Sequence, residues 1–367
     1  MIIYHSMIAW IVVMAGLYTF AKQTDVIRGE KNDEVPLIFA VVTFGYIVFW
    51  SGMRSGVADT AVYIDMFEAL EENIFNIPQY WFNDAKGPGF RTLGVLFKSL
   101  ISDNYHMWFT FIATVSGVGI MYTLKKHSVN FFYSAFLFIV TLNFYWLLNG
   151  IRQFLVAAVL FGLSDWVIQR KTVPFMIAIL LLSTIHSTVL IMIPIYFIVT
   201  GRPFGGKIIF FSVILIGCIV FLEPFTEILN TALAETNYSG AVEQFAQDDG
   251  VNPIRVLVMA IPSVIALMGR KQLEQLGNTY INVCVNMSFV SAGLYFIGMF
   301  TSGILVGRLP IYFELYNMIL LPFLIENIFN YRSSKFIYIL CTIGYLGFYI
   351  LQSGPLYYIS EITGLLN

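Results

Sequence analysis

Three arginines and one histidine are the residues best able to do chemistry in this sequence of 367 residues. Arg54, Arg152 and Arg308 each lie at the end of an apolar run, and His186 lies between the two halves of another. A charge near lipid is costly unless it is paired or solvated in a cavity. Ionisable side chains at these positions therefore indicate a structural or functional role. Guanidinium groups bind phosphate oxygens through paired hydrogen bonds, and histidine exchanges a proton near neutral pH.

Together these groups suit the attack of a hydroxyl on a carbon that carries a diphosphate leaving group. The arginines would stabilise the departing diphosphate, and the histidine would accept the proton of the hydroxyl. No nucleotide-binding loop occurs in the sequence, so the donor must carry its own activation, as a lipid diphosphate-linked sugar does. Asp59 and Asp65 share one loop, but their spacing is weak evidence for a metal, and the arginines make a metal unnecessary. We therefore predict neither a cofactor nor a metal site.

The composition predicts an all-α polytopic membrane protein. Apolar residues make up 58% of the chain and charged residues 11%, and the mean hydropathy is +0.77. Soluble domains carry about 25% charged residues, so lipid must be the main solvent of this chain. The formal net charge of −2 gives no sign of nucleic-acid binding.

Ten apolar runs are long enough to predict membrane spans, since a crossing helix needs about 20 residues. They are 2–20, 37–52, 105–124, 130–148, 151–169, 207–222, 254–269, 278–300, 307–327 and 336–352. The first lacks a basic segment before it and a cleavage site after it, and is read as a span rather than a signal peptide.

Orientation follows from six clusters of lysine and arginine, because cytoplasmic loops retain positive charge. The clusters are Lys22 with Arg28 and Lys31, Lys125 with Lys126, Arg170 with Lys171, Arg202 with Lys207, Arg270 with Lys271, and Arg332 with Lys335. All can face the cytoplasm if 90–102 is an amphipathic or re-entrant segment and 174–200 is a broken-helix hairpin. A single tilted helix over 174–200 is the alternative, but it would place some of the basic clusters on the opposite side of the membrane from the others.

This arrangement predicts about 12 transmembrane helices in a single integral membrane domain over 1–367, with both termini outside. The segments 53–104, with a surface or re-entrant helix, and 223–253 would be external loops. Arg54, Arg152, Arg308 and His186 all fall on the external side. Glu314, within the run 307–327, could pair with an arginine or take part in the chemistry.

Four short motifs resemble those of the EpsG family of polysaccharide polymerases. They are Arg54 followed by Gly56-Val57-Ala58-Asp59-Thr60-Ala61-Val62-Tyr63, then Asn149-Gly150-Ile151-Arg152-Gln153, then Ile185-His186-Ser187-Thr188-Val189-Leu190, and last Gly307-Arg308-Leu309-Pro310-Ile311-Tyr312-Phe313. The third departs from the family pattern in the placement of its serine. The motifs occur in order across most of the chain, which makes the set more specific than any member.

The resemblance implies a Wzy-type polymerase in the bacterial cytoplasmic membrane, with its active site facing outward. Such proteins move a growing glycan from undecaprenyl diphosphate to the sugar of an incoming lipid-linked repeat. The resemblance assigns these residues: Arg152 and Arg308 to the diphosphate, His186 as the base or as the group that orients the acceptor hydroxyl, and Arg54, Asp59, Asn149, Gln153 and Tyr312 to substrate binding. The expected partners are undecaprenyl diphosphate-linked donor and acceptor glycans, the lipid bilayer, a chain-length regulator and a flippase.

Three other functions fit parts of the pattern. A transporter or flippase of lipid-linked sugars also binds diphosphate, although alternating access favours repeated architecture, and no repeat is evident. An O-antigen-ligase-like enzyme would use similar residues with another acceptor. An O-acyltransferase also pairs histidine with polar groups, but it needs an acyl donor from the cytoplasmic side, where no central histidine is expected.

Overall fold

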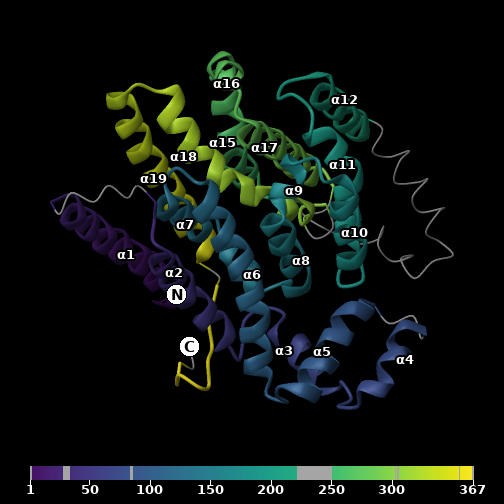
Figure 1. The fold of residues 1–367 in the computed structure, drawn as a ribbon. Coiled ribbons are helices and arrows are strands. Elements are labelled where there is room, and N and C mark those ends of the chain that lie inside the picture. Colours follow the sequence, from purple (N-terminus) through teal and green to yellow (C-terminus); the bar gives the residue numbers. More distant parts are fainter. Residues whose placement is uncertain are drawn as a thin grey trace. The chain divides into compact units, whose positions relative to one another are not determined.

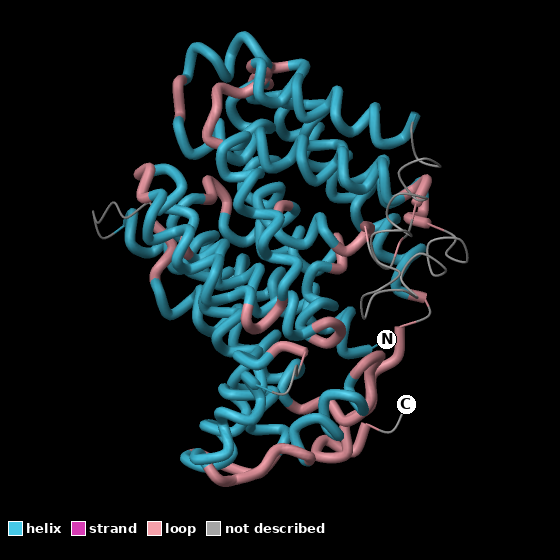
Figure 2. Tube along the Cα trace, turned by 90° about the vertical axis from the view of Figure 1, so that its right-hand side faces the viewer, coloured by secondary structure: helices cyan, strands magenta, loops and turns pink. Residues whose placement is uncertain are grey.

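The computed structural model describes residues 2–27, 34–82, 86–220, 250–301, 303, 306–354 and 356–365 (Figure 1). These residues form helices, turns and two isolated bridges, and they contain no β-strand (Figure 2). The chain divides into two compact units. Unit 1 is Met1–Met192 with Leu340–Asn367, and unit 2 is Ile193–Ile339.

Unit 1 holds most of the predicted chemistry on a framework of α-helices and short 3-10 helices. The elements are α1 (Ile2–Ile27), α2 (Leu37–Gly52), α3 (Thr60–Glu68), η1 (Ile74–Asn76), α4 (Ile77–Phe82), α5 (Pro88–Leu100), α6 (Tyr105–His127), α7 (Phe131–Val140), η2 (Asn143–Leu147), α8 (Ile151–Gly162), α9 (Ser164–Ile168), α10 (Thr172–Ser183), η3 (Ser187–Ile191) and the later part of α19 (Tyr331–Ser353).

Small residues let the long helix α6 pack closely against α2 and α8. A Cβ atom on Gly119 of α6 would lie 2.5 Å from the Ala158 carbonyl of α8, and one on Gly162 would lie 3.3 Å from the Gly119 Cα. Glycine and alanine are enriched where membrane helices approach backbone to backbone, because lipid supplies no hydrophobic force between helices. The later half of α8 is thereby fixed against α6.

An aromatic cluster around Trp108 of α6 joins α3 and α5 to the same helix. Its indole is 1% exposed, and its ring centroid lies 5.5 Å from that of Phe67, 5.4 Å from Phe90 and 5.2 Å from Phe97. Aromatic pairs at such distances add to the stability gained from burial alone. The cluster therefore holds α3 and α5 in a defined position relative to α6.

The chain segment 356–365 pairs with the turn that contains Arg54. The Ser55 and Gly56 N–H groups both donate to the Ile359 carbonyl, at 2.8 and 3.2 Å, and the Ile359 N–H donates back to the Gly56 carbonyl at 3.1 Å. The Tyr358 hydroxyl donates to the Trp50 carbonyl at 2.7 Å. Two segments at opposite ends of the sequence thus form one structure within unit 1.

Unit 2 is built around α17, which packs against α12, α15 and α18. Its elements are most of α11 (Met192–Val199), α12 (Gly206–Val220), α15 (Pro253–Met268), α16 (Arg270–Leu276), α17 (Thr279–Gly298), η4 (Leu309–Tyr312), η5 (Glu314–Tyr316), α18 (Asn317–Ile328) and the start of α19. Asn286 of α17 donates to the Val199 and Gly201 carbonyls at 2.9 and 3.0 Å, which ties the end of α11 to this core.

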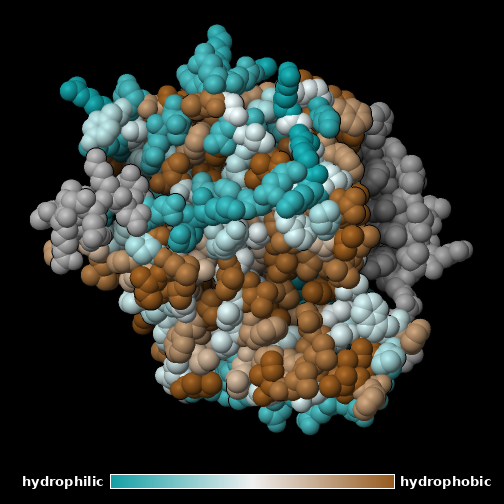
Figure 3. Space-filling view, viewed as in Figure 1, coloured by the Kyte–Doolittle hydropathy of each residue, from teal (hydrophilic) through white to brown (hydrophobic). Residues whose placement is uncertain are grey.

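Four described helices are long and apolar enough to cross a membrane. They are Ile2–Gln23, Tyr105–His127, Thr279–Gly298 and Tyr331–Ser353, and the number rises to five if the bent pair Pro253–Met268 and Arg270–Leu276 is one span. Large apolar side chains are exposed along them, and one face shows broad apolar areas (Figure 3). The structure is that of an all-α membrane protein.

The predicted number of about 12 spans is not confirmed, because several apolar runs are divided into shorter helices. The run 130–148 becomes α7 and η2, separated where Leu142 adopts a φ of 65°. The run 307–327 becomes η4, η5 and α18. Six further apolar helices have 10–17 residues, so a count based on uninterrupted length finds fewer spans than the apolar runs predict.

Two local predictions are confirmed by the helix boundaries. Residues 90–100 of the segment 90–102 lie in the amphipathic helix α5, which buries Phe90, Val95 and Phe97 and ends in exposed Leu100. The segment 174–200 is broken as predicted, since α10 ends at Ser183 and η3 begins at Ser187. That 174–200 crosses and returns stays a prediction. Most of the predicted external loop 223–253 lies outside the described residues.

Candidate functional site

The start of α8 places Arg152 at the second position of a helix whose preceding residue requires glycine. Gly150 caps α8 with a φ of +67°, a left-handed conformation that glycine adopts without strain. Helix starts also leave backbone N–H groups without helical partners, which favours anions nearby. The predicted grouping of Asn149, Arg152 and Gln153 therefore lies at a helix start whose backbone conformation is defined by Gly150.

Arg152 is half-buried and is held from three sides. Its guanidinium carbon lies 5.9 Å from the centroid of the Phe90 ring, and Nη1 makes a long 3.4 Å hydrogen bond to the Lys86 carbonyl. The hydroxyl of Tyr63 is within hydrogen-bonding reach of the same guanidinium. Nε of Arg152 is buried and has no partner among the residues that the structure describes. The side chain is therefore positioned but retains a donor for a ligand.

Tyr63 is a candidate site residue that has no role in the sequence predictions, although it closes the first motif. Its side chain is 8% exposed, and burial raises the pKa of its hydroxyl, an effect that Arg152 only partly offsets. The hydroxyl therefore stays protonated and can accept from Arg152 while donating its own proton to an anion.

A hydrogen-bond chain links Gln153, Thr188 and His186. The Gln153 amide donates to the Thr188 hydroxyl at 3.3 Å, and that hydroxyl lies 2.8 Å from Nδ1 of His186. If Nδ1 carries the proton, the Thr188 oxygen accepts from both neighbours, and Nε2 is the basic nitrogen of the ring. The structure thus identifies Thr188, and not Ser187, as the hydroxyl that orients His186.

Gly87 connects the arginine to the histidine segment. A Cβ atom on it would lie 2.7 Å from Nη1 of Arg152 and 3.0 Å from the Ile185 carbonyl, next to His186. The neighbouring Gly89 N–H donates to the Thr184 carbonyl at 2.9 Å. The loop before α5 therefore fits between Arg152 and the helix break, and the two predicted catalytic residues of unit 1 lie in one neighbourhood.

Arg54 lies inside the protein, with 0% of its surface exposed. Nε donates to the Thr60 hydroxyl at 3.2 Å, Nη1 donates to the Ser51 carbonyl, and the guanidinium carbon lies 4.1 Å from the centroid of the Phe109 ring. Burial lowers the pKa of Arg54 to about 10, which still leaves it charged at neutral pH. These contacts give Arg54 a structural role in the 54–60 turn, and its part in substrate binding stays a prediction.

Asp59 and Asn149 lie at element boundaries near these groups. Asp59 is half-buried before α3, makes no side-chain cap, and acts electrostatically on Tyr63 and Tyr145. The buried Oδ1 of Asn149 has no hydrogen-bond partner among the described residues. An acceptor without a partner is costly when buried, so this oxygen is a candidate contact for a substrate hydroxyl.

Arg308 and Tyr312 belong to unit 2, so their predicted meeting with Arg152 and His186 stays a prediction. Arg308 is half-buried at the start of η4, and Tyr312 is 3% exposed. A second polar chain lies in this unit: the Tyr295 hydroxyl donates to Glu314 at 2.5 Å and is also within hydrogen-bonding reach of Arg255.

Glu314 is 1% exposed and accepts from Tyr295, which is also within reach of Arg255; a direct pairing of Glu314 with an arginine stays a prediction. Among the described residues, no group of three or more histidine, cysteine, aspartate or glutamate side chains could hold a metal ion.

Comparison with known proteins gives one match. The family model for the EpsG family matches residues 37–355. A search of curated proteins and a search of solved structures each gave no significant match. The matched range includes Arg54, Arg152, His186 and Arg308.

Proposed function

Because this chain belongs to the EpsG family, whose members are Wzy-type polysaccharide polymerase-like proteins, we propose that it is a membrane glycosyltransferase. It polymerises undecaprenyl diphosphate-linked oligosaccharide repeats into an exopolysaccharide or O-antigen-type glycan, at the outer face of the bacterial cytoplasmic membrane. The observation that carries the proposal is Arg152, which is held by Tyr63, Phe90 and Lys86 beside the His186 segment and keeps an unused buried donor.

In the proposed reaction, a hydroxyl of the acceptor repeat attacks the anomeric carbon of the donor glycan. The new C–O bond forms as the bond to undecaprenyl diphosphate breaks, and the acceptor proton passes to Nε2 of His186. Arg152 donates to the departing diphosphate, whose negative charge increases, and Tyr63 donates a second hydrogen bond. Thr188 holds the His186 ring through the 2.8 Å contact at Nδ1, and the reaction uses the tautomer that carries its proton on Nδ1, which leaves Nε2 able to accept.

The remaining predicted residues act around this centre. Asn149 and Gln153 lie on either side of Arg152 in the sequence, where Asn149 would bind a sugar hydroxyl and Gln153 would fix Thr188. Arg308 would hold a second part of the diphosphate, with Tyr312 beside it in the same motif. Asp59 would bind the acceptor, because a carboxylate accepts hydrogen bonds from sugar hydroxyls.

The test uses the purified full-length protein in liposomes with purified lipid-linked repeats and no other enzyme. Growth of the glycan by whole repeats, with release of undecaprenyl diphosphate, is the expected result. Movement of repeats across the bilayer without growth would instead identify a flippase. Transfer to a core lipid alone would identify a ligase, and acylated repeats formed after addition of an acyl donor would identify an acyltransferase.

A further inference from the structure

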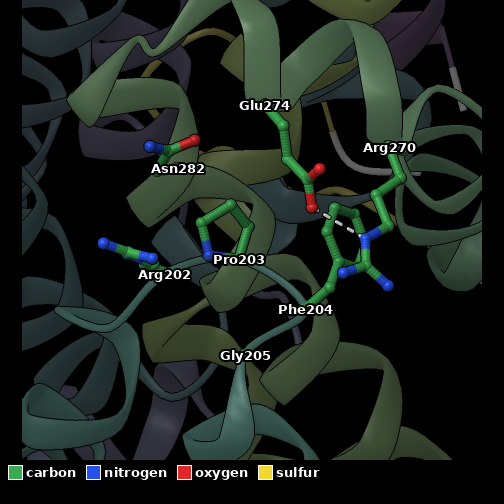
Figure 4. A pocket seen from close by; sticks show the side chains of 7 residues that line it. All are labelled: Arg202, Pro203, Phe204, Gly205, Arg270, Glu274 and Asn282. Carbon is green, nitrogen blue, oxygen red and sulfur yellow. Dashed lines mark hydrogen bonds and ion pairs between the residues drawn. The ribbon is translucent and has the colours of Figure 1, made fainter.

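One cavity in unit 2 is lined by none of the residues used in the proposed reaction. It has a volume of about 500 Å³ and is lined by Arg202, Pro203, Phe204, Gly205, Arg270, Glu274 and Asn282. Figure 4 shows Arg202 and Asn282 on one side of it and the Arg270–Glu274 pair on the other. A cavity of this size is within the range of sites that bind small molecules.

The lining carries more positive than negative charge. Arg270 Nε donates to Glu274 at 2.8 Å, whereas the Arg202 guanidinium forms no hydrogen bond within the described part of the chain. Both members of the Arg270–Glu274 pair are about half exposed, so their ion pair contributes little and can be exchanged for a stronger one. Two guanidinium groups across a cavity suit a phosphate group, which each can bind through paired hydrogen bonds.

The floor of the cavity is a strained residue. Phe204 has a φ of 56°, which is unusual for a bulky side chain, and it is 8% exposed. The Phe289 ring contacts it at a centroid distance of 5.5 Å, and the Arg270 guanidinium carbon lies 5.5 Å from its ring centroid. Strained backbone persists where the surroundings enforce it, often at ligand sites. The Phe204 ring thus lies against the Arg270 guanidinium, and both line the cavity.

A lipid-facing helix begins at the edge of the cavity. α12 starts at Gly206, directly after the lining residue Gly205, and exposes Ile209, Phe210 and Val213 by 58–63%. Its 15 residues span about 22 Å, which exceeds the acyl region of one leaflet, about 15 Å. A ligand with a charged head in the cavity can lay apolar chains along this helix.

We propose that this cavity binds the phosphodiester headgroup of an anionic phospholipid, with Arg202 and Arg270 on the phosphate and Asn282 on the glycerol. Basic pockets between membrane helices on the cytoplasmic side are suited to such headgroups. The predicted topology places both the 202–207 and the 270–271 clusters on that side. The ligand stabilises unit 2 and takes no part in glycan transfer.

The experiment measures binding of dioctanoyl phosphatidylglycerol to the full-length protein in neutral detergent by native mass spectrometry. Arg202→Ala is expected to weaken binding about tenfold, the loss of one charge-assisted contact. Glu274→Gln is expected to tighten binding, since it releases Arg270 and removes a negative charge. Arg332→Ala, an exposed arginine outside the cavity, is the matched control and should leave affinity unchanged.

Two comparison ligands distinguish the source of the phosphate. Glycerol 3-phosphate has the charge without the chains, and dioctanoyl phosphatidylcholine has the chains without net charge, so both should bind at least tenfold more weakly. Equal binding of glycerol phosphate would overturn the assignment to a lipid. Equal binding of phosphatidylcholine, or unchanged affinity in both the Arg202 and Glu274 variants, would overturn the anion site. Chain growth in the Arg202→Ala protein should remain at the wild-type rate.

Discussion

Gly87 lies against Arg152 so closely that a Cβ atom on Gly87 would come within 2.7 Å of the arginine Nη1. Gly87 also has a φ of +70°, so two independent constraints favour glycine. The contact joins the loop before α5 to the first turn of α8. Any side chain at position 87 must move the guanidinium that the proposed reaction needs.

Replacement of Gly87 with alanine should lower the rate of chain growth by about 10²-fold, because a small displacement of a positioning group is costly in catalysis. Gly277→Ala is the matched control: that glycine has a φ of +60° but nothing within 4 Å of a Cβ atom. Both variants should lose about 1 kcal/mol of stability from the left-handed backbone, and Gly87→Ala should lose more because its Cβ also meets the Ile185 carbonyl. Equal rates for the two variants would show that the Gly87 contact does not position Arg152.

Arg152→Lys should reduce turnover by about 10²–10³-fold while the protein stays folded, since lysine keeps the charge but cannot supply the planar pair of donors. Turnover of purified protein with saturating lipid-linked repeats measures this effect. Arg91→Lys, a half-buried arginine of α5 outside the proposed centre, serves as the control. Polymer formation near the wild-type rate in the Arg152 variant would remove this arginine from the diphosphate site.

His186→Gln separates catalysis from structure. Glutamine keeps a donor and an acceptor but cannot take up the proton, so chain growth should fall by about 10²–10⁴-fold with substrate binding retained. Wild-type activity should also decline at low pH, as protonation removes the base, and the residual activity of the variant should lack that decline. A glutamine variant that polymerises at a normal rate would rule out His186 as the base, and Asp59 would be the next candidate.

Thr188→Val tests the orientation of the imidazole. Valine has nearly the same shape but cannot hydrogen-bond, so the ring loses the 2.8 Å contact at Nδ1. We expect a smaller loss than for His186→Gln, about tenfold, with a shifted pH profile. Ser187→Ala is the control, because the Ser187 hydroxyl takes no part in the hydrogen bonds that link Gln153, Thr188 and His186. An unchanged pH profile would show that another group orients His186.

Arg54→Lys should lower the melting temperature more than it lowers catalysis. Lysine cannot contact Thr60 and Ser51 together from the buried position, and an unsatisfied buried group costs about 1–3 kcal/mol. Thermal unfolding followed by intrinsic fluorescence, with Arg91→Lys as the reference, measures the difference. An unchanged melting temperature combined with weaker substrate binding would support the predicted binding role of Arg54 instead.

The parts of the fold that local sequence specifies were predictable. A glycine before Arg152 predicts a helix start, and the polar residues around His186 predict the break between α10 and η3. The low charge content predicts lipid as solvent, and the charged positions of 90–102 indicate an amphipathic helix. Each of these signals acts over a few residues, where composition and backbone preference decide the outcome.

Other features depend on contacts that no local pattern specifies. The number of uninterrupted spans depends on breaks such as Leu142, whose positive φ is imposed by packing rather than by residue type. The placement of Tyr63 and Gly87 against Arg152 requires chain segments about 60–90 residues apart to meet. The burial of Arg54 likewise reverses the usual expectation for a charged residue near a helix end.

The pairing of residues 356–365 with the Arg54 turn also determines when this region can assemble during protein synthesis. The Glu361 N–H donates to the Ser55 hydroxyl across 306 positions of sequence. A ribosome delivers the Arg54 turn to the membrane long before it makes the segment that pairs with it. While the remaining helices are made, the Ser55 and Gly56 N–H groups of this turn therefore lack their partner, the Ile359 carbonyl. Final assembly of this region of unit 1 therefore follows the synthesis of the helices that lie between the two segments in the sequence.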